Sequence, residues 1–452
     1  MSLVDKDDQQ PSVPSVNDSF LAPSEMTVNS SNSPNDPYLA LRSRDFRLLI
    51  IGTFLSSIGE RMLEVALGWE LYERTHSALV LGGVGLVLII PVILLSLPAG
   101  HIIDRFNRKY IMLFSQCFLV LGSLGLTLLS LYNGSLALIY VCLLMIGSAT
   151  AFGSPASSAL TALTVPRDAF ENSATWNSSS WQLASVLGPG LGGLMIALFK
   201  TGTAVYALNT LMAVIFFILV FSVKTSGHAR PAIDVALSTE ETSSWHDLFE
   251  GLRFLSKTQV LFAAITLDLF AVLLGGATTL LPVFASDILH VGPTGLGWLR
   301  AAPSVGAILV ALIVAHRPPF KRAGRTLLVA VVGFGLATIV FGLSKNFWLS
   351  LLMLFLLGGL DNISVVIRAA LVLTRTPEHM RGRVSAVNAL FVGTSNELGG
   401  FESGLTAQLF GPVVSVVGGG IGTVLVVICI ALFWPEMRRL GTLRDAETKA
   451  LE

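Results

Sequence analysis

Residues 78–109 read ALVLGGVGLVLIIPVILLSLPAGHIIDRFNRK. Up to Gly100 this stretch has no charged side chain, and a run of about 20 mostly apolar residues is what a helix needs to cross the hydrocarbon core of a bilayer. Three basic residues, Arg105, Arg108 and Lys109, follow directly. The pattern predicts a membrane-spanning helix over 77–99 that ends in a short basic turn.

The composition of the whole chain favours a membrane protein as well. The chain has 452 residues, of which 53% are hydrophobic and 13% are charged, whereas soluble domains carry about 25% charged residues. The net charge is zero, so bulk electrostatics do not favour a nucleic-acid partner. The three cysteines lie in apolar runs without metal-ligand spacing, and we interpret them as small apolar side chains.

Hydropathy along the chain predicts an all-α membrane protein with twelve transmembrane helices in two pseudo-symmetric six-helix bundles. The expected spans are 46–72, 77–99, 110–131, 136–164, 172–199, 203–223, 258–286, 293–315, 325–343, 347–374, 383–408 and 412–434.

Polar segments divide the chain between these spans. Residues 1–41 are rich in Ser, Asn, Pro and Asp and have no apolar signal-peptide core, which predicts a disordered cytoplasmic tail. We expect an N-terminal bundle over 42–223 and a C-terminal bundle over 258–434, followed by a cytoplasmic tail over 435–452. Between the bundles, 224–257 is expected to form a cytoplasmic linker that contains an amphipathic helix.

The distribution of Lys and Arg predicts the orientation. Of the 29 Lys and Arg residues, only Arg74, Lys200 and Lys345 fall in loops on one side, and most of the others fall in the tails and loops of the opposite side. Because cytoplasmic loops are enriched in Lys and Arg, this bias predicts both termini in the cytoplasm and a multi-pass protein of the cell inner (cytoplasmic) membrane.

The two halves show a weak internal repeat. A shift of 211 or 212 residues brings glycines, prolines and basic residues of the first half onto identical or similar residues of the second. Among the matched pairs are Gly85 with Gly297, Pro91 with Pro303, Pro166 with Pro377 and Gly188 with Gly399. Duplicated halves are typical of transporters, whose substrate site lies between the halves near the bilayer midplane.

The basic turn contains the most specific motif, Gly100-His-Ile-Ile-Asp104-Arg105-Phe-Asn-Arg108-Lys109. It resembles the G-x-x-x-D-R-x-x-R-R/K motif of the major facilitator superfamily. The resemblance implies a gate that holds the outward-facing state. A glycine at 100 would let two helices approach closely, and Arg105 and Arg108 could pair with acids. The alternative is a basic membrane anchor with no gating role.

Span five carries Gly188-Pro189-Gly190-Leu191-Gly192-Gly193. This segment resembles the G-P-x-x-G-G core of the superfamily's antiporter motif, although Ala184 and Thr175 stand where that motif has further glycines. The resemblance implies export by ion exchange. A packing motif common to any helix bundle is the alternative.

Further segments resemble a branch of exporters, the transmembrane secretion effector family, which includes enterobactin and macrolide exporters. They are YERTHSAL at 72–79, TPEHMRGRVSAVN at 376–388 and ELGGFESG at 397–404. Gly400 departs from this pattern, because an acid is expected there. The resemblance covers roughly residues 40–440 and implies a small-molecule exporter driven by ion exchange.

Ionisable side chains inside spans are costly unless they are paired or face water, so they are candidates for the proton and substrate sites. In span one, Thr53, Ser56, Glu60 and Glu64 share a helical face, and Arg61 can pair with Glu64. A structural ion pair is the alternative. The full set of cavity candidates is Glu60, Arg61, Glu64, Asp268, Asp361, Arg368, Glu397 and Glu402.

Asp361 and Glu64 are the preferred proton carriers, because burial favours the protonated form of a carboxyl group. Arg368 and Arg61 are the expected charge partners or substrate anchors. We expect Arg300 to lie near a helix end or in an ion pair. At an offset of 211, Asp361 and Arg368 fall on Thr150 and Ser157 of the first half.

The sequence therefore predicts a monomeric secondary transporter that exports a small amphiphilic molecule, siderophore-like or drug-like, in exchange for protons. No nucleotide-binding, protease or esterase motif is present, which argues against an enzyme, and no cofactor or metal is expected. An importer or uniporter on the same fold, and a membrane sensor or assembly protein without transport activity, remain as alternatives.

Overall fold

The computed structural model describes residues 36–225, 244–318 and 320–441. All of its helices belong to one unit, Tyr38–Glu452. Disorder was predicted for residues 1–41; residues 1–35 lie outside the described residues, as do most of the linker and the end of the C-terminal tail. The end of the predicted tail is ordered, because Ala40 is buried and begins a 3-10 turn.

The first half contains the six expected long helices. A short 3-10 turn, η2 (Ala40–Arg42), leads into α1, where the Ser43 side chain caps the helix by accepting a hydrogen bond from the Phe46 amide. The long helices are α1 (Arg44–Thr75), α2 (Ala78–Arg105), α3 (Arg108–Leu131), α4 (Leu136–Thr164), α5 (Phe170–Phe199) and α6 (Thr203–Ser222), with a 3-10 turn, η3 (Arg167–Ala169), before α5.

The second half begins with the expected amphipathic helix, α7 (Ser244–Lys257), and its long helices follow. They are α8 (Gln259–Leu274), α10 (Gly292–Ala315), α11 (Ala323–Leu343), α12 (Phe347–Arg375), α13 (Glu378–Phe410) and α14 (Pro412–Phe433), and the short α15 (Pro435–Arg439) closes the described chain.

Span seven departs from the prediction, since it is not one continuous helix over 258–286. After α8 it continues as η4 (Ala277–Leu280), α9 (Leu281–Val283) and a π-helical turn, η5 (Phe284–Ile288). The break lies at Gly275 and Gly276. A Cβ atom at Gly276 would lie only 2.9 Å from the Gly399 carbonyl carbon of α13, so this glycine permits a close backbone approach at the point where the helix is interrupted.

Within the described residues, ten helical segments are long and apolar enough to cross a membrane by length and composition. The segment Gln259–Ile288, with its break, is one of them. Helices α1 and α13 are as long as the others but more polar, and they complete the expected twelve. These two more polar helices carry the acidic cavity candidates of spans one and eleven.

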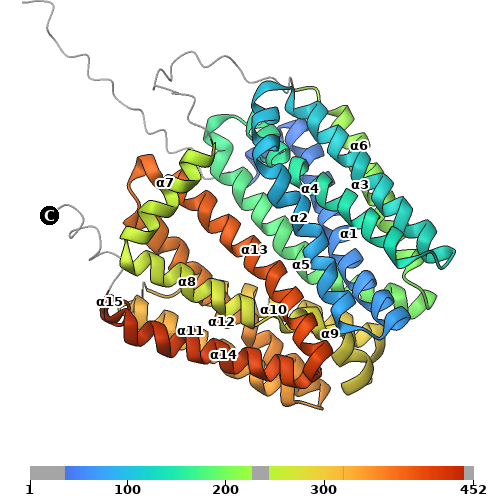
Figure 1. Ribbon diagram of the computed structural model, residues 1–452. Helices are drawn as coiled ribbons and strands as arrows, with labels where there is room; N and C mark the ends of the chain where they lie inside the picture. The colour runs from blue at the N-terminus through green and yellow to red at the C-terminus, as the bar shows by residue number, and fades with distance from the viewer. Residues whose placement is uncertain (1–35, 226–243, 319, 442–452) are drawn as a thin grey trace, which may run out of the picture. The chain divides into compact units, whose positions relative to one another are not determined.

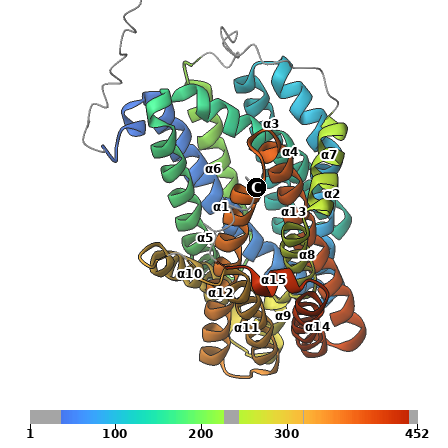
Figure 2. The ribbon, with the colours of Figure 1, turned by 90° about the vertical axis from the view of Figure 1, so that its left-hand side faces the viewer.

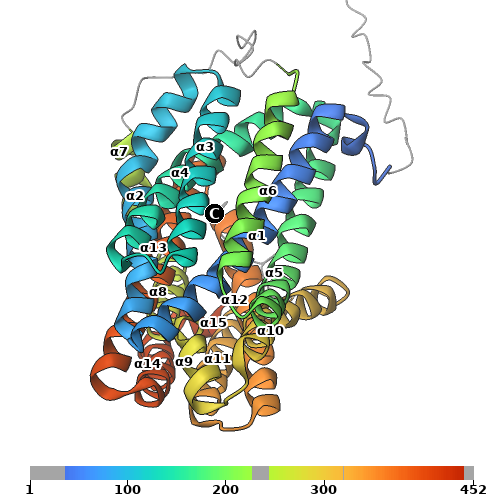
Figure 3. The same cartoon turned by 90° about the vertical axis from the view of Figure 1, so that its right-hand side faces the viewer.

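The two halves repeat the same packing scheme, as the sequence offset predicts. Helix α1 packs on α5 and α6, and α8 packs on α13 and α14 in the same way; α2 pairs with α4, and α10 pairs with α12. Two further pairs, α5 with α10 and α2 with α13, join the halves (Figures 1 and 3).

The halves meet mainly at one end, which we call the closed end and which carries the turns at 132–135, 200–202 and 344–346. There one hydrophobic cluster includes residues of both halves, such as Leu67, Ile196 and Leu296. At the opposite end, the basic end, which carries the turns at 106–107 and 376–377, each half has its own cluster, around Met112 in the first half and Leu371 in the second.

Glycines allow the close approach at the closed end. A Cβ atom at Gly193 of α5 would lie 2.9 Å from the Gly297 Cα atom of α10, and one at Gly82 of α2 would lie 3.2 Å from the Gly404 Cα atom of α13. Figure 2 shows α5 running down to α10. Small residues at these crossings bring the backbones of the two halves into contact.

The amphipathic helix α7 packs on α13 and α8. Arg383 of α13 pairs with Glu250 of α7 at 2.5 Å, and Leu255 is buried. On the first half, the Asp45 carboxylate accepts hydrogen bonds from the amides of Lys224 and Thr225, at 3.1 and 2.7 Å. The described start of the linker therefore contacts the first half, and its described end contacts the second half.

Candidate functional site

Helix α1 carries the predicted polar stripe along one face, and this stripe borders two cavities. Thr53, Ser56 and Glu60 line the first cavity, whereas Glu64 lines the second. The Ser56 hydroxyl donates a hydrogen bond of 3.3 Å to Glu60. The residues of one helical face are thus divided between two cavities.

The first cavity, which we call the first-half cavity, has a volume of about 590 Å³ and is lined only by residues of α1, α3, α4, α5 and α6. It reaches from the middle of α1 to Phe170 at the basic end of α5. Hydroxyl and amide side chains dominate its wall: Thr53, Ser56, Ser57, Ser115, Gln116, Thr150, Ser154, Ser157, Ser158, Thr161, Ser173, Asn177 and Ser180.

The second cavity, the interface cavity, has a volume of about 470 Å³ and lies between α1 and α2 of the first half and η4, α10 and α13 of the second. The expected pair of Arg61 and Glu64 is present, with 2.8 Å between Nη1 and Oε1. Arg300 of α10 reaches the other Glu64 oxygen at 3.3 Å, and Glu397 lines the same cavity. Glu64 therefore joins the two halves.

The side chains of this cluster are held by neighbours on both sides. The Arg61 guanidinium lies over the Trp181 ring of α5, 5.5 Å from its centroid, a distance at which a cation is attracted to an aromatic face. Arg61, Glu64 and Arg300 keep 33%, 35% and 24% of their side-chain surface exposed, so the ion pairs face a hydrated space rather than a dry core.

A second ion pair lies inside the second half. Arg368 of α12 pairs with Asp268 of α8, and their side chains are only 8% and 6% exposed. Arg368 was expected to be a charge partner or a substrate anchor, and the carboxylate that reaches its guanidinium comes from α8 rather than from Asp361 of its own helix. Asp361 and Asp268 instead line a cavity of about 10 Å³, which is room for no more than a water molecule.

The remaining candidate, Glu402, lies apart from the interface cavity. Glu402 is half-buried on α13, lines neither of the two large cavities and makes no ion pair within the described part of the chain. The spacing of Glu397 and Glu402 puts them about 140° apart around the helix, so they cannot both face one cavity.

The motif after span two differs from expectation in its contacts. Gly100 is exposed and a Cβ atom there would meet nothing within 4 Å, so the expected close helix approach is not found. Arg105 is exposed, and in the described ranges neither Arg105 nor Arg108 makes an ion pair. Lys109 instead donates to the carbonyls of Phe221 and Val223, at 2.9 and 2.5 Å, at the end of α6. The side chain of Asp104 lies outside the described ones.

The glycines of the antiporter-like segment pack α5 against α1 and α10. A Cβ atom at Gly188 would lie 3.0 Å from the Ile58 carbonyl oxygen, and one at Gly192 would lie 3.1 Å from the Met62 backbone. Pro189 is buried inside α5, next to the crossing with α10 that Gly193 makes.

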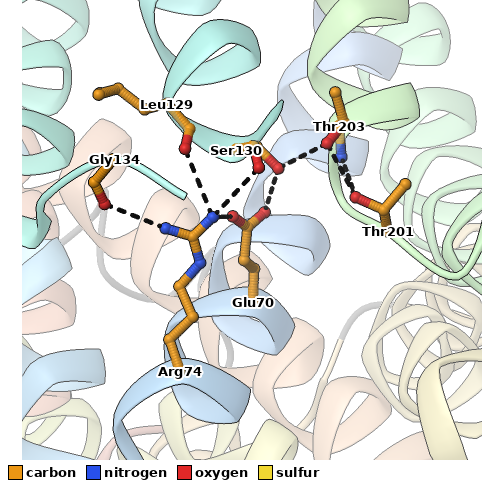
Figure 4. A network of polar contacts seen from close by, with 7 residues as sticks. All are labelled: Glu70, Arg74, Leu129, Ser130, Gly134, Thr201 and Thr203. Atoms are coloured by element: carbon orange, nitrogen blue, oxygen red, sulfur yellow. Dashed lines mark hydrogen bonds and ion pairs between the residues drawn. The ribbon is translucent and has the colours of Figure 1, made fainter. Parts of the chain in front are cut away.

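Two features of the closed end escaped the sequence analysis. Buried Glu70 pairs with Arg74 at 2.5 Å and accepts a hydrogen bond from the Ser130 hydroxyl at 3.0 Å, while Arg74 also donates to carbonyls at the end of α3 (Figure 4). The Tyr72 hydroxyl donates to Asp287 of η5, in the other half. The i, i+4 spacing of Glu70 and Arg74 was the available signal for the first feature.

Comparisons with known proteins agree with this architecture. The family model described as transmembrane secretion effector matches residues 35–445. The enterobactin exporters of Citrobacter koseri and Escherichia coli are 28% and 26% identical over 396 residues, covering 87% of this chain and 92% of theirs.

Solved structures share the fold at low sequence identity. The nucleoside transporter NupG superposes with a TM-score of 0.67 at 13% identity, covering 86% of this chain and 99% of its own. A bacterial homologue of the human lysosomal transporter Spinster gives a TM-score of 0.65 at 15% identity, covering 88% and 97%. Together with the two packed six-helix halves, these matches show that the chain belongs to the transmembrane secretion effector family of the major facilitator superfamily and is a membrane transporter rather than an enzyme.

Proposed function

We propose that this transporter exports a small amphiphilic molecule from the cytoplasm by alternating access, in exchange for protons. The observation that carries the proposal is the charge cluster of the interface cavity, where Glu64 binds arginines of both halves and Glu397 lies in the same cavity. A siderophore-like cargo is supported by the name of the enterobactin exporters to which the chain is similar, and a drug-like cargo by the volume of its cavities.

The orientation follows from the positive-inside rule. The basic end carries most of the Lys and Arg residues and faces the cytoplasm in our proposal. Both termini are then cytoplasmic, and the protein is a monomer of the inner membrane. The halves meet at the closed end, so this conformation would be open to the cytoplasm and able to receive cargo there.

The charge cluster offers a route to coupling. Protonation of Glu64 would remove the charge that holds Arg61 of the first half and Arg300 of the second, and the cross-half ion pair would be lost. Glu397, which has no ion pair of its own in the described residues, could take or release the proton within the same cavity. A proton entering from the outside would thus change the balance between the two faces of the transporter.

Transport in everted membrane vesicles tests the proposal. An imposed inward-acidic proton gradient should drive uptake of a catechol siderophore or a macrolide, and Glu64→Gln should abolish that gradient-driven uptake. Glu73→Gln is the matched control, because Glu73 is an exposed residue of the same helix at its closed end. Failure of every cargo to respond to the gradient would refute proton-driven export, and uptake in the opposite direction would identify an importer.

A further inference from the structure

A surface groove lies at the basic end of the first half, beside the turn that joins α2 and α3. It has a volume of about 510 Å³ and is lined by residues of α2, α3, α4 and that turn. Among them are Ile102, Arg105, Phe106, Tyr110, Phe114 and Phe152. The groove shares no lining residue with the first-half cavity or the interface cavity, so it is a separate site.

The apolar wall of the groove belongs to the face that α3 turns outward. Tyr110 and Phe114 keep 67% and 58% of their surface exposed, and the same helical face continues with exposed leucines. These are Leu121, Leu124, Leu128 and Leu131. A continuous exposed apolar face on a membrane-spanning helix lies against lipid. The groove therefore opens towards the bilayer.

The groove crosses the boundary between lipid headgroups and acyl chains. Helix α3 has 24 residues and is about 36 Å long, which exceeds the hydrocarbon thickness of about 30 Å. Because its first two residues, Arg108 and Lys109, are basic, its first turn lies among the headgroups. Phe114 lies six residues further, about 9 Å along the helix axis, and reaches the acyl chains.

Arg105 gives the upper part of the groove a positive charge. It is exposed and makes no ion pair in the described ranges, and none of the described side chains that line the groove is acidic. The N-terminus of α3 begins beside it, and the helix dipole adds partial positive charge there. A phosphate group suits this place, because a guanidinium binds two phosphate oxygens at once.

The equivalent place in the second half is basic but not aromatic. At the offset of 212 residues, Arg105 corresponds to Arg317. The aromatic residues Phe106, Tyr110 and Phe114 correspond to Pro318, Arg322 and Thr326. A lipid that was attracted by charge alone would therefore favour the second half, whereas a lipid that also needs an apolar wall would favour the groove.

We propose that this groove binds one anionic phospholipid from the leaflet at the basic end. The lipid phosphate lies on Arg105, and an acyl chain runs along Tyr110 and Phe114. In the orientation proposed above this is the cytoplasmic leaflet, whose surface potential is negative. The site gives the transporter a lipid partner that is independent of its cargo.

Native mass spectrometry of the purified full-length protein in a neutral detergent tests the proposal. The first dioleoyl phosphatidylglycerol should bind at least about fivefold more tightly than dioleoyl phosphatidylcholine, because only the former carries a net negative charge. Glycerol 3-phosphate, which has the phosphate but no acyl chains, should not displace it even in large excess. Equal affinity of the two lipids, displacement by glycerol 3-phosphate, or no lipid binding would overturn the proposal.

Two variants with matched controls locate the lipid. Arg105→Gln should weaken phosphatidylglycerol binding about fivefold, whereas Arg317→Gln, which removes an exposed arginine from the more basic equivalent place, should not. Phe114→Ala should weaken binding about threefold, whereas Leu124→Ala, on the same exposed face but outside the groove lining, should not. All four side chains are exposed, so thermal unfolding should stay unchanged.

Each outcome of these variants has a distinct meaning. Equal losses for Arg105→Gln and Arg317→Gln would show bulk electrostatic attraction and refute a site in the groove. Unchanged binding in both groove variants would place the lipid elsewhere and refute it as well. The assay needs neither cargo nor gradient, so it is independent of export. If the lipid binds as expected while vesicles show no gradient-driven uptake, proton-driven export fails and the lipid site stands.

Discussion

The crossing of α5 and α10 at the closed end allows a quantitative prediction for Gly193→Ala. The added Cβ atom would lie 2.9 Å from the Gly297 Cα atom and 3.0 Å from its nitrogen, whereas ordinary contacts begin at 3.4 Å. The Pro293 carbonyl oxygen would lie closer still, so the backbones of the two halves would have to separate by at least about 0.5 Å, the difference between 3.4 and 2.9 Å. Overpacking of this kind costs about 1–3 kcal/mol.

This cost applies to the conformation in which the halves touch at the closed end. The population of the conformation in which the halves touch at the closed end, relative to the one in which they are separated there, should therefore fall by a factor of about 5 to 150. Gly190→Ala is a control on the same helix, since a Cβ atom at Gly190 would meet nothing within 4 Å.

Pulsed electron–electron double resonance can measure this change in the two populations. Spin labels at Lys200 and Lys345, two exposed positions in closed-end turns of opposite halves, report the separation of the halves in a background without native cysteines. Gly193→Ala should add a population at longer distance, and Gly190→Ala should not. If the distance distributions of both variants equal that of the unsubstituted protein, the glycine crossing does not control the closed end.

Three further predictions concern the polar contacts. Arg368→Leu leaves the charge of Asp268 buried without its partner and should lower the free energy of unfolding by about 3–5 kcal/mol. Most of this loss should be restored in D268N/R368L. Equal thermal unfolding of the single variant and the unsubstituted protein would contradict the prediction. Glu397→Gln should keep cargo exchange down its own gradient but lose the response to a proton gradient, and an unchanged response in vesicles would exclude Glu397 as the coupling residue. Tyr72→Phe removes the hydrogen bond to Asp287 and should shift the spin-label distances in the same direction as Gly193→Ala, by about 1 kcal/mol; an unchanged distribution would show that the bond does not stabilise closure.

Hydropathy alone predicted nearly all of the helical framework. The predicted span over 136–164 coincides with α4, and most other bounds differ by a few residues, because an apolar run of membrane length has few alternatives to a helix once water is absent. Span seven was the exception. Its hydropathy is continuous, and the interruption coincides with Gly275 and Gly276 and with the close approach of Gly276 to α13, which is a tertiary contact.

The sequence also identified the residues of the charge cluster but not all of their partners. Arg61 and Glu64 are three residues apart on one helix, so their pairing follows from helical geometry. Arg300 and Asp268 reach Glu64 and Arg368 from other helices, far away in the chain. Periodicity fixes which face of a helix a residue occupies but not which helix packs against that face, so these pairs depend on the tertiary structure.

The sequence by itself determined that the chain crosses a membrane in two related halves, because both the apolar runs and the repeat offset are properties of residue order. Only the tertiary structure decided where the halves touch and which half is hollow. Ser157 and Arg368 are equivalent positions at this offset, but the Ser157 hydroxyl lines an open cavity, whereas the Arg368 guanidinium is buried in an ion pair. The difference arises because each cavity is lined by side chains from several helices. The order of residues along one helix does not determine which other helices pack against it.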